Sequence, residues 1–249
     1  MENRSVWPTT KDGSFIVGVT AFGLYAETHD FNASNMVLAA LPPIITARKN
    51  PAKKVYILKY PEIHVTYGSV SQAVQDIWNP KSPAWSKSAV AADIEYENTE
   101  ALKVNFVLHL GQMRSFPGYS FEKLANRDGY LRRDLDNQLP ATVQNATGDS
   151  VEEQFISCPT ILKPDIDVEL VTTEVKTRIP NTLIRASTDA GRFSCEYILY
   201  SSLAELWKRG LDKRVMFMHV PAKSSEKDIT EGVDVAINLI LTIVDMLES

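Results

Sequence analysis

Cys195, one of two cysteines in the sequence, lies where a turn-like Asp-Ala-Gly segment runs into a helical pattern. The residues that follow it recur at spacings of three, four, seven and eleven, which predicts a helix that begins near Ser194. The unpaired amides of a helix's first turn carry partial positive charge, which stabilises a thiolate. Cys195 is therefore a candidate nucleophile. The alternative is a cysteine on the helix's buried face, because free cysteines are commonly buried.

A histidine and a carboxylate elsewhere in the chain could complete a thiol site. His219 ends an apolar strand pattern just before Pro221, where it could take a proton from a thiol and return it to a leaving amine. Glu122 follows a glycine-rich segment that we expect to be a loop, and it could orient the imidazole as the third member of a triad. A packed strand-end histidine and an exposed hairpin glutamate are the alternatives.

The other three histidines do not form a metal-binding pattern. His29, His64 and His109 are scattered, without the i,i+4 spacing or cysteine pairs that zinc sites use, so we expect no metal. His109 falls inside a strand pattern and is expected to lie in the core. The sequence also lacks a Gly-x-Gly-x-x-Gly motif and a P-loop, so we expect no nucleotide cofactor.

Strand and helix patterns alternate along the chain, which predicts a mostly parallel sheet covered by helices on both faces. In such sheets active residues gather past the carboxyl ends of the strands. We expect strands over 14–20, 54–60, 104–110, 182–187 and 214–220. We expect helices over 35–41 capped by Ser34, over 68–78, over 165–178, from Ser194, and from Asp228 in a capping box with Glu231.

Length and charge limit the classes of function. The 249 residues suit a single α/β domain, with residues 1–13 as a flexible N-terminus and residues 79–101 as a surface insertion. Residues 131–164 are polar and irregular, and their placement is left open. A net charge of -5 argues against nucleic-acid or anionic-membrane partners. Two cysteines and no apolar leader favour a cytoplasmic protein. The sequence carries no signal for an oligomeric state.

Four stretches of the sequence resemble, in order, the conserved blocks of pyroglutamyl peptidase I, the pyrrolidone-carboxylate peptidases. The stretches are SFIVGVTAFGLYAETHDFNAS, FVLHLGQMRSFPGYSFEKLANRDGY with DLDN a little later, STDAGRFSCEYILYSSL and RVMFMHVP. Together they reach from Phe15 to the last helix. The residues of these stretches are more similar to the eukaryotic branch of the family, with its fungal and animal forms, than to the bacterial branch.

The resemblance implies an open three-layer α/β/α sandwich of the phosphorylase/hydrolase-like type. It implies a cysteine peptidase that removes an N-terminal pyroglutamate from peptides without a metal or cofactor. Position by position, Cys195 matches the nucleophile, His219 the general base and then acid, and Glu122 the orienting carboxylate. The implied partners are peptides that begin with pyroglutamate.

The pyroglutamyl ring is small, flat and uncharged, so its pocket should offer aromatic faces and a few aimed hydrogen-bonding groups. By the resemblance, Phe22 and Phe193 match the aromatics that sandwich the ring, and Tyr25 matches a third aromatic beside them. Asn32 matches a motif asparagine that holds the loop or the lactam, and its alternative role is a helix cap. Gln112 matches a loop position near the substrate.

An oxyanion formed during acyl transfer needs hydrogen-bond donors, and the Cys195 backbone N–H at the helix start is one natural donor. The bacterial relatives add an arginine about ten residues after the triad glutamate. Arg132 lies at about that spacing and Arg127 lies closer. The alternative is that both are solvated side chains.

The first block departs from the family pattern at three positions. Ala21 replaces a glycine, which matters if that position needs a positive φ, and Leu24 replaces a turn-setting proline. Tyr25 adds a hydroxyl to the pocket wall. These departures support a second reading, a catalytically silent relative that binds pyroglutamyl peptides or has a structural role. A third reading, a nucleoside phosphorylase-like enzyme, has only sheet topology in its favour.

Overall fold

The computed structural model describes residues 13–25, 30–79, 85, 104–144 and 150–247. Seven strands of this described chain form the central sheet, in the order β10-β5-β11-β4-β1-β3-β2. Their bounds are Phe15–Ala21 for β1, Ile44–Thr46 for β2, Lys54–Lys59 for β3, Phe106–Met113 for β4, Tyr119–Glu122 for β5, Ile184–Ser187 for β10 and Val215–Pro221 for β11.

The sheet is mostly parallel. Strands β11, β4, β1 and β3 run side by side in one direction, and β10 runs parallel to β5. Two junctions are antiparallel, between β5 and β11 and between β2 and β3. The predicted sheet type is therefore confirmed. Two of its strands, β2 and β5, were not predicted, and the expectation that the segment holding β5 is a loop is wrong.

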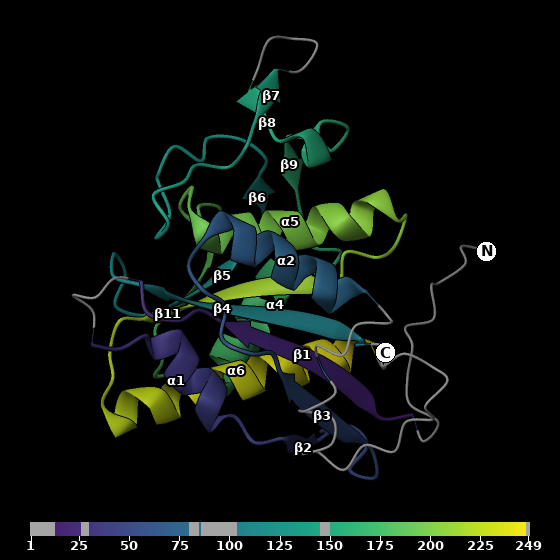
Figure 1. Ribbon diagram of the computed structural model, residues 1–249. Helices are drawn as coiled ribbons and strands as arrows, with labels where there is room; N and C mark the ends of the chain where they lie inside the picture. The colour runs from purple at the N-terminus through teal and green to yellow at the C-terminus, as the bar shows by residue number, and fades with distance from the viewer. Residues whose placement is uncertain (1–12, 26–29, 80–84, 86–103, 145–149, 248–249) are drawn as a thin grey trace.

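Helices cover both faces of the sheet, as Figure 1 shows. Helices α2 (Tyr67–Trp78) and α5 (Ser194–Lys208) pack together on one face. Helices α1 (Ala33–Ala40), α4 (Val168–Arg178) and α6 (Glu226–Leu247) cover the other. The expected three-layer α/β/α architecture is confirmed.

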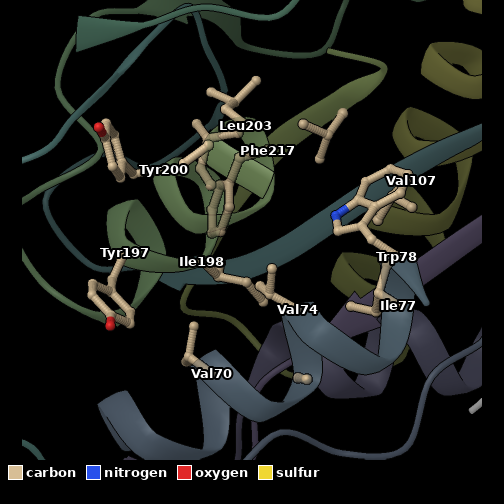
Figure 2. Close-up of a cluster of buried hydrophobic side chains, with 14 of the residues drawn as sticks. Val70, Val74, Ile77, Trp78, Val107, Tyr197, Ile198, Tyr200, Leu203 and Phe217 are labelled. Atoms are coloured by element: carbon tan, nitrogen blue, oxygen red, sulfur yellow. The ribbon is translucent and has the colours of Figure 1, made fainter. Parts of the chain in front are cut away.

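Alternate residues of the inner strands feed two separate apolar cores. Val107 of β4 and Phe217 of β11 point toward α2 and α5, where they meet Val74 and Ile198 (Figure 2). Met216, one residue before Phe217, instead joins the core beneath α1, α4 and α6. This period-two alternation fixes which side chains can meet the first turn of α5.

Residues 131–164, whose placement the sequence left open, contribute to a small lobe beside α5. The lobe holds β6 (Ala125–Asn126), β7 (Val143–Gln144), β8 (Ser150–Val151), the short helix η2 (Glu153–Phe155) and β9 (Ile161–Leu162). Phe155 joins it to α5 through edge-to-face contacts with Tyr197 and Tyr200. The lobe stands above α5 in Figure 1.

Three predicted helix starts were wrong, by two residues for α1 and by three residues for α4 and α6. Asn32, rather than Ser34, caps α1, since its side chain accepts the Ser34 N–H. Helix α6 begins at Glu226, and the Ser225 side chain accepts the Asp228 N–H, so Asp228 lies inside the first turn.

Several expectations fall mainly outside the described residues. These are the flexible N-terminus over 1–13, of which only Gly13 is described, and the insertion over 79–101, of which only Asn79 and Trp85 are described. Trp85 is buried, and its ring lies against Gly18 and edge-on to Tyr60. His29 is also outside. None of the helices that the structure describes is long and apolar enough to cross a membrane.

Candidate active site

Glu122 and His219 meet on the face of the sheet that α5 covers. Strands β5 and β11 run antiparallel, with Ser120 opposite His219, so Glu122 is a diagonal neighbour of His219 on the same face. Glu122 Oε1 lies 2.8 Å from His219 Nδ1, and both side chains are buried. The exposed-hairpin interpretation of Glu122 is therefore wrong. Because β5 runs opposite to β11, the rule about strand carboxyl ends does not account for Glu122.

The Cys195 side chain approaches His219 from helix α5, which covers this face of the sheet. Helix α5 begins at Ser194, so the sulfur sits in the first turn, next to the helix's unpaired amides. Cys195 is partly exposed, whereas Cys158 is buried. It packs at the edge of the core beneath α5, together with Phe193 and Tyr25. The thiol is thus not sealed in hydrocarbon.

The imidazole of His219 is held between the other two groups. Burial alone would lower the pKa of His219. The hydrogen bonds and negative charges of Cys195 and Glu122 together outweigh burial and raise the pKa to about 9. With Nδ1 bound to Glu122, Nε2 is the nitrogen left to face the thiol. At neutral pH the arrangement therefore favours a cationic imidazolium.

Gly111 makes room for the sulfur, and sequence reasoning missed it. On β4 this glycine pairs with His219 in the sheet. A Cβ added to Gly111 would lie 2.8 Å from Cys195 Sγ and 2.5 Å from Phe217 Cζ, closer than real Cβ contacts. The sulfur therefore lies directly over the β4–β11 pair, beside the imidazole. A lone glycine at a strand end gives no sequence signal of what approaches it.

A Gly111→Ala variant should therefore lose activity because its methyl group must push the sulfur or Phe217 aside. A displacement of about 1 Å in a reacting atom costs about a hundredfold in rate, so we expect at least that loss in kcat/KM. Gly68→Ala is the matched control, since nothing lies within 4 Å of its added Cβ and the residue sits in α2. Steady-state kinetics of both variants measures the difference. Equal rates for the two would contradict the placement of the sulfur.

The predicted aromatic residues gather on the same side of Cys195. The rings of Tyr25 and Phe193 meet edge-to-face at a centroid distance of 5.5 Å, and Phe193 meets Tyr67 at 5.9 Å. Phe22 is buried just past the end of β1, in the core that Tyr25 and Phe193 border. Strand β1 pairs with β4 only up to Ala21, so β1 leaves the last part of β4 uncovered on the Phe22 side.

Ala21 itself causes no backbone conflict. It pairs with Leu110 in the sheet, and it is absent from the positive-φ residues of the described chain. The concern that this position requires a glycine is therefore unfounded. Leu24 is half-exposed.

Asn32 and Gln112 hold the segment behind the aromatic residues. Asn32 Nδ2 donates to the Gly23 carbonyl at 2.7 Å while its Oδ1 caps α1, so loop-holding and capping occur together. Gln112 lies inside β4, not in a loop beyond it as expected, and its Oε1 accepts the Ala33 N–H at 2.7 Å. Both side chains tie the start of α1 to the sheet near Phe22.

The two candidate arginines have different surroundings. Arg132 lies over the rings of Tyr25 at 4.7 Å and Phe193 at 4.6 Å, and it donates to the Tyr25 hydroxyl at 2.6 Å. Arg127 is buried, pairs with Asp128 at 2.9 Å and donates to the Cys158 carbonyl at 2.9 Å. Neither is a freely solvated side chain.

Glu196, the residue after Cys195, is a second feature that sequence reasoning missed. Its buried Oε1 accepts the Asn126 N–H at 2.8 Å and the Asn126 side-chain amide at 2.7 Å, and pairs with Arg192 at 2.6 Å. Asn126 closely follows Glu122, so these contacts tie the chain after β5 to the start of α5. The i,i+4 spacing of Arg192 and Glu196 was the available signal.

The other two histidines that the structure describes, His109 and His64, have partners outside the proposed triad. His109 is buried between the hydroxyls of Thr20 at 2.8 Å and Ser202 at 2.9 Å, and burial lowers its pKa to about 3, which keeps it neutral. His64 is exposed beside Asp136. Within the described residues, no group of three or more His, Cys, Asp or Glu side chains could hold a metal ion.

Comparisons with known proteins identify the fold. No protein-family model and no curated protein matches the chain. The solved structure of pyrrolidone carboxyl peptidase from the hyperthermophile Pyrococcus furiosus is similar, with a TM-score of 0.63 and 14% identity over 94% of this chain and 100% of that one. Pyroglutamyl peptidase I from Bacillus amyloliquefaciens is also similar, with a TM-score of 0.62 and 15% identity over 92% of this chain and 98% of that one. At these identities the likeness shows the fold.

Proposed function

We propose that the chain is a cysteine peptidase of the pyroglutamyl peptidase I type, which removes N-terminal pyroglutamate from peptides. The observation that carries the proposal is the meeting of Cys195, His219 and Glu122 on the α5 face of the sheet. Solved structures with the same fold bear the names pyrrolidone carboxyl peptidase and pyroglutamyl peptidase I. The four sequence blocks favour the eukaryotic branch of that family, and a free catalytic thiol suits the reducing cytoplasm.

The proposed reaction is acyl transfer through the thiol. The Cys195 thiolate attacks the pyroglutamyl carbonyl carbon, and the His219 imidazolium gives its proton to the departing amine as the C–N bond breaks. The product is a thioester on Cys195 and a free peptide amine. His219, now neutral, takes a proton from water, whose hydroxide attacks the thioester and releases pyroglutamate.

Glu122 keeps His219 in the useful tautomer and orientation. Its carboxylate accepts the Nδ1–H, which directs Nε2 toward the sulfur and stabilises the cationic ring. Glu196 and Gly111 act as positioning residues, the first by tying Asn126 to α5 and the second by leaving room for the sulfur.

The ring of the substrate is assigned to the aromatic side of the sulfur. Phe22, Tyr25 and Phe193 supply apolar faces for a neutral lactam, and the main chain of β4 beyond its pairing with β1 is assigned to the lactam N–H and C=O. Asn32 and Gln112 hold this wall in place rather than reaching the ring.

Two donors are assigned to the oxyanion. The first is the Cys195 backbone N–H in the first turn of α5. The second is Arg132, which lies against the proposed ring-binding aromatics. Arg127 is engaged with Asp128 and the Cys158 carbonyl, so its role is structural.

Replacing each arginine by methionine should separate these roles. Arg132→Met is expected to lower kcat/KM about tenfold or more with little change in stability, because the side chain is exposed. Arg127→Met should leave kcat/KM nearly intact and lower the free energy of unfolding by about 1–3 kcal/mol, because the buried Cys158 carbonyl loses its donor. Kinetics and urea unfolding of both variants decide. The reverse pattern would assign the oxyanion to Arg127.

The function is tested with fluorogenic amides that differ only in the acyl group. The protein should release the fluorophore from the pyroglutamyl amide and at least about a hundredfold more slowly from the prolyl amide, which lacks the lactam carbonyl. Equal rates on the two amides would argue against the proposed substrate.

A catalytically silent relative remains the second candidate. The feature in its favour is Arg132, whose guanidinium stacks on the aromatic rings assigned to the substrate. Absence of turnover together with measurable binding of a pyroglutamyl peptide would select this candidate.

A further inference from the structure

A row of paired residues crosses the sheet through the site, on the face that α5 covers. Register pairs join Arg185 of β10 to Ser120 of β5, Ser120 to His219 of β11, and His219 to Gly111 of β4. Phe22 continues the row, one residue beyond the pair of Ala21 and Leu110. Paired residues in neighbouring strands point to the same face.

This row gives the bound peptide a direction. Sγ of Cys195 lies over Gly111, so the scissile carbonyl belongs there. The acyl group extends toward Phe22 by the proposed function, on which this inference rests. The leaving nitrogen must reach His219 to receive its proton, so the leaving peptide runs past His219 toward Ser120 and Arg185.

A pocket of about 400 Å³ lies beside that path, where the Arg185 guanidinium stacks on the ring of its lining residue Phe116. It is lined by Met113, Arg114, Phe116, Pro117, Pro221, Ala222 and Lys223. Met113 pairs with Pro221 two residues after the pair of Gly111 and His219, on the same face of the sheet. Two strand residues span about 6.6 Å, so the pocket begins within reach of the first two residues of the leaving peptide.

The pocket's surroundings are positively charged. Arg114 and Lys223 line it, and the Arg185 guanidinium stacks on the Phe116 ring at 4.0 Å. Arg185 Nε also donates to Ser120 Oγ at 2.9 Å, which fixes the fork of the guanidinium. Lys223 pairs with Asp228, whose Oδ1 lies 4.0 Å from Lys223 Nζ. Among the residues that the structure describes, these three cations and the carboxylate paired with Lys223 leave a positive balance at the pocket, which an incoming anion would neutralise.

We propose that this pocket binds a carboxylate of the leaving peptide, within the first two residues after pyroglutamate. The carboxylate is either an acidic side chain or the α-carboxylate of a very short peptide. The protein then prefers acidic or very short pyroglutamyl peptides over neutral amidated ones. No covalent step is involved, and the triad keeps its role.

The test compares substrates that differ only in a carboxylate. Pyroglutamyl-Glu-Ala-amide against pyroglutamyl-Gln-Ala-amide tests the side chain, and pyroglutamyl-Ala against its amide tests the α-carboxylate. In at least one pair we expect the acid to have a kcat/KM about tenfold higher than its neutral counterpart. An effect of this size is typical of a partly exposed charge-assisted hydrogen bond. In Lys223→Met and Arg185→Gln the ratio should fall toward one. The exposed Lys176→Met, on helix α4 of the opposite face of the sheet, should keep the wild-type ratio.

Two results would overturn this inference while leaving the proposed function standing. They are ratios near one for both wild-type pairs, or ratios that persist in both pocket variants. If wild type cleaves none of the four peptides, the proposed peptidase activity fails, and their dissociation constants are measured instead. Tighter binding of the acids, lost in Lys223→Met, would support the pocket. Equal binding, or no binding, would refute it.

Discussion

Cys195→Ala is expected to abolish hydrolysis of pyroglutamyl amides, with a loss of about ten-thousandfold or more in kcat. The expectation follows from the single sulfur that lies over Gly111 within reach of His219. Alanine keeps the helix and removes the nucleophile, and Cys195 is only partly buried, so the fold should persist. Turnover of a fluorogenic amide, with circular dichroism to verify folding, measures the effect.

Cys158→Ala is the matched control for this substitution. Cys158 is buried in the small lobe beside α5, so the variant should lose about 1 kcal/mol or more of stability to the cavity while keeping its kcat. If Cys195→Ala and wild type turned over at similar rates, the nucleophile would have to be another group.

Glu122→Gln is expected to lower kcat by about a hundredfold to ten-thousandfold without changing the shape of the site. The amide has the same size as the carboxylate, but it lacks the charge that stabilises the imidazolium and can present an N–H to His219 Nδ1. His219 would then lose both its orientation and its anionic partner. Kinetics on the fluorogenic amide measures the loss, and an unchanged kcat would remove Glu122 from the mechanism.

The same variant makes a pH prediction. Wild-type activity should fall as the pH rises through about 9, because His219 loses the proton that it gives to the leaving amine. Glu122→Gln removes one of the interactions that raise this pKa, so its alkaline limb should move to lower pH. An identical alkaline limb in both proteins would mean that it reports some other group.

The raised pKa of His219 also predicts how the free energy of unfolding depends on pH. A pKa raised in the folded state stabilises the protein fully below the unfolded pKa of about 6.5, and this contribution disappears as the pH rises through the folded value. Glu122→Gln should therefore cost more stability at about pH 6 than at about pH 10. Urea unfolding at the two pH values measures the difference.

The alternating sheet and its helical layers could be predicted from sequence because long strands such as β1, β4 and β11 carry continuous apolar runs. Strand β5 could not be. Its four residues lie in a glycine-rich stretch, and they form a strand because β10 and β11 supply hydrogen-bond partners on both sides. Local pattern therefore left Glu122 in a loop, although the tertiary pairing buries it.

The sequence pointed to the three residues of the proposed triad, but not to the residues that position them. Cys195 and His219 stood at the ends of recognisable elements, and the structure brings both together with Glu122. Gly111 and Glu196 act through what they approach, namely the sulfur and Asn126. These two contacts join residues distant in the chain, so local spacing does not report them, and the i,i+4 spacing of Arg192 and Glu196 signals only their ion pair.

The most direct measurement of the proposed mechanism is the mass of the acyl-enzyme. Pyroglutamyl p-nitrophenyl ester releases its alcohol quickly, so the thioester should accumulate and survive a rapid acid quench. We predict that intact mass rises by one pyroglutamyl group per chain and that peptide mapping finds the group on Cys195. Modification of Cys158 instead, or turnover of the ester without any group on Cys195, would contradict thiol acyl transfer at this site.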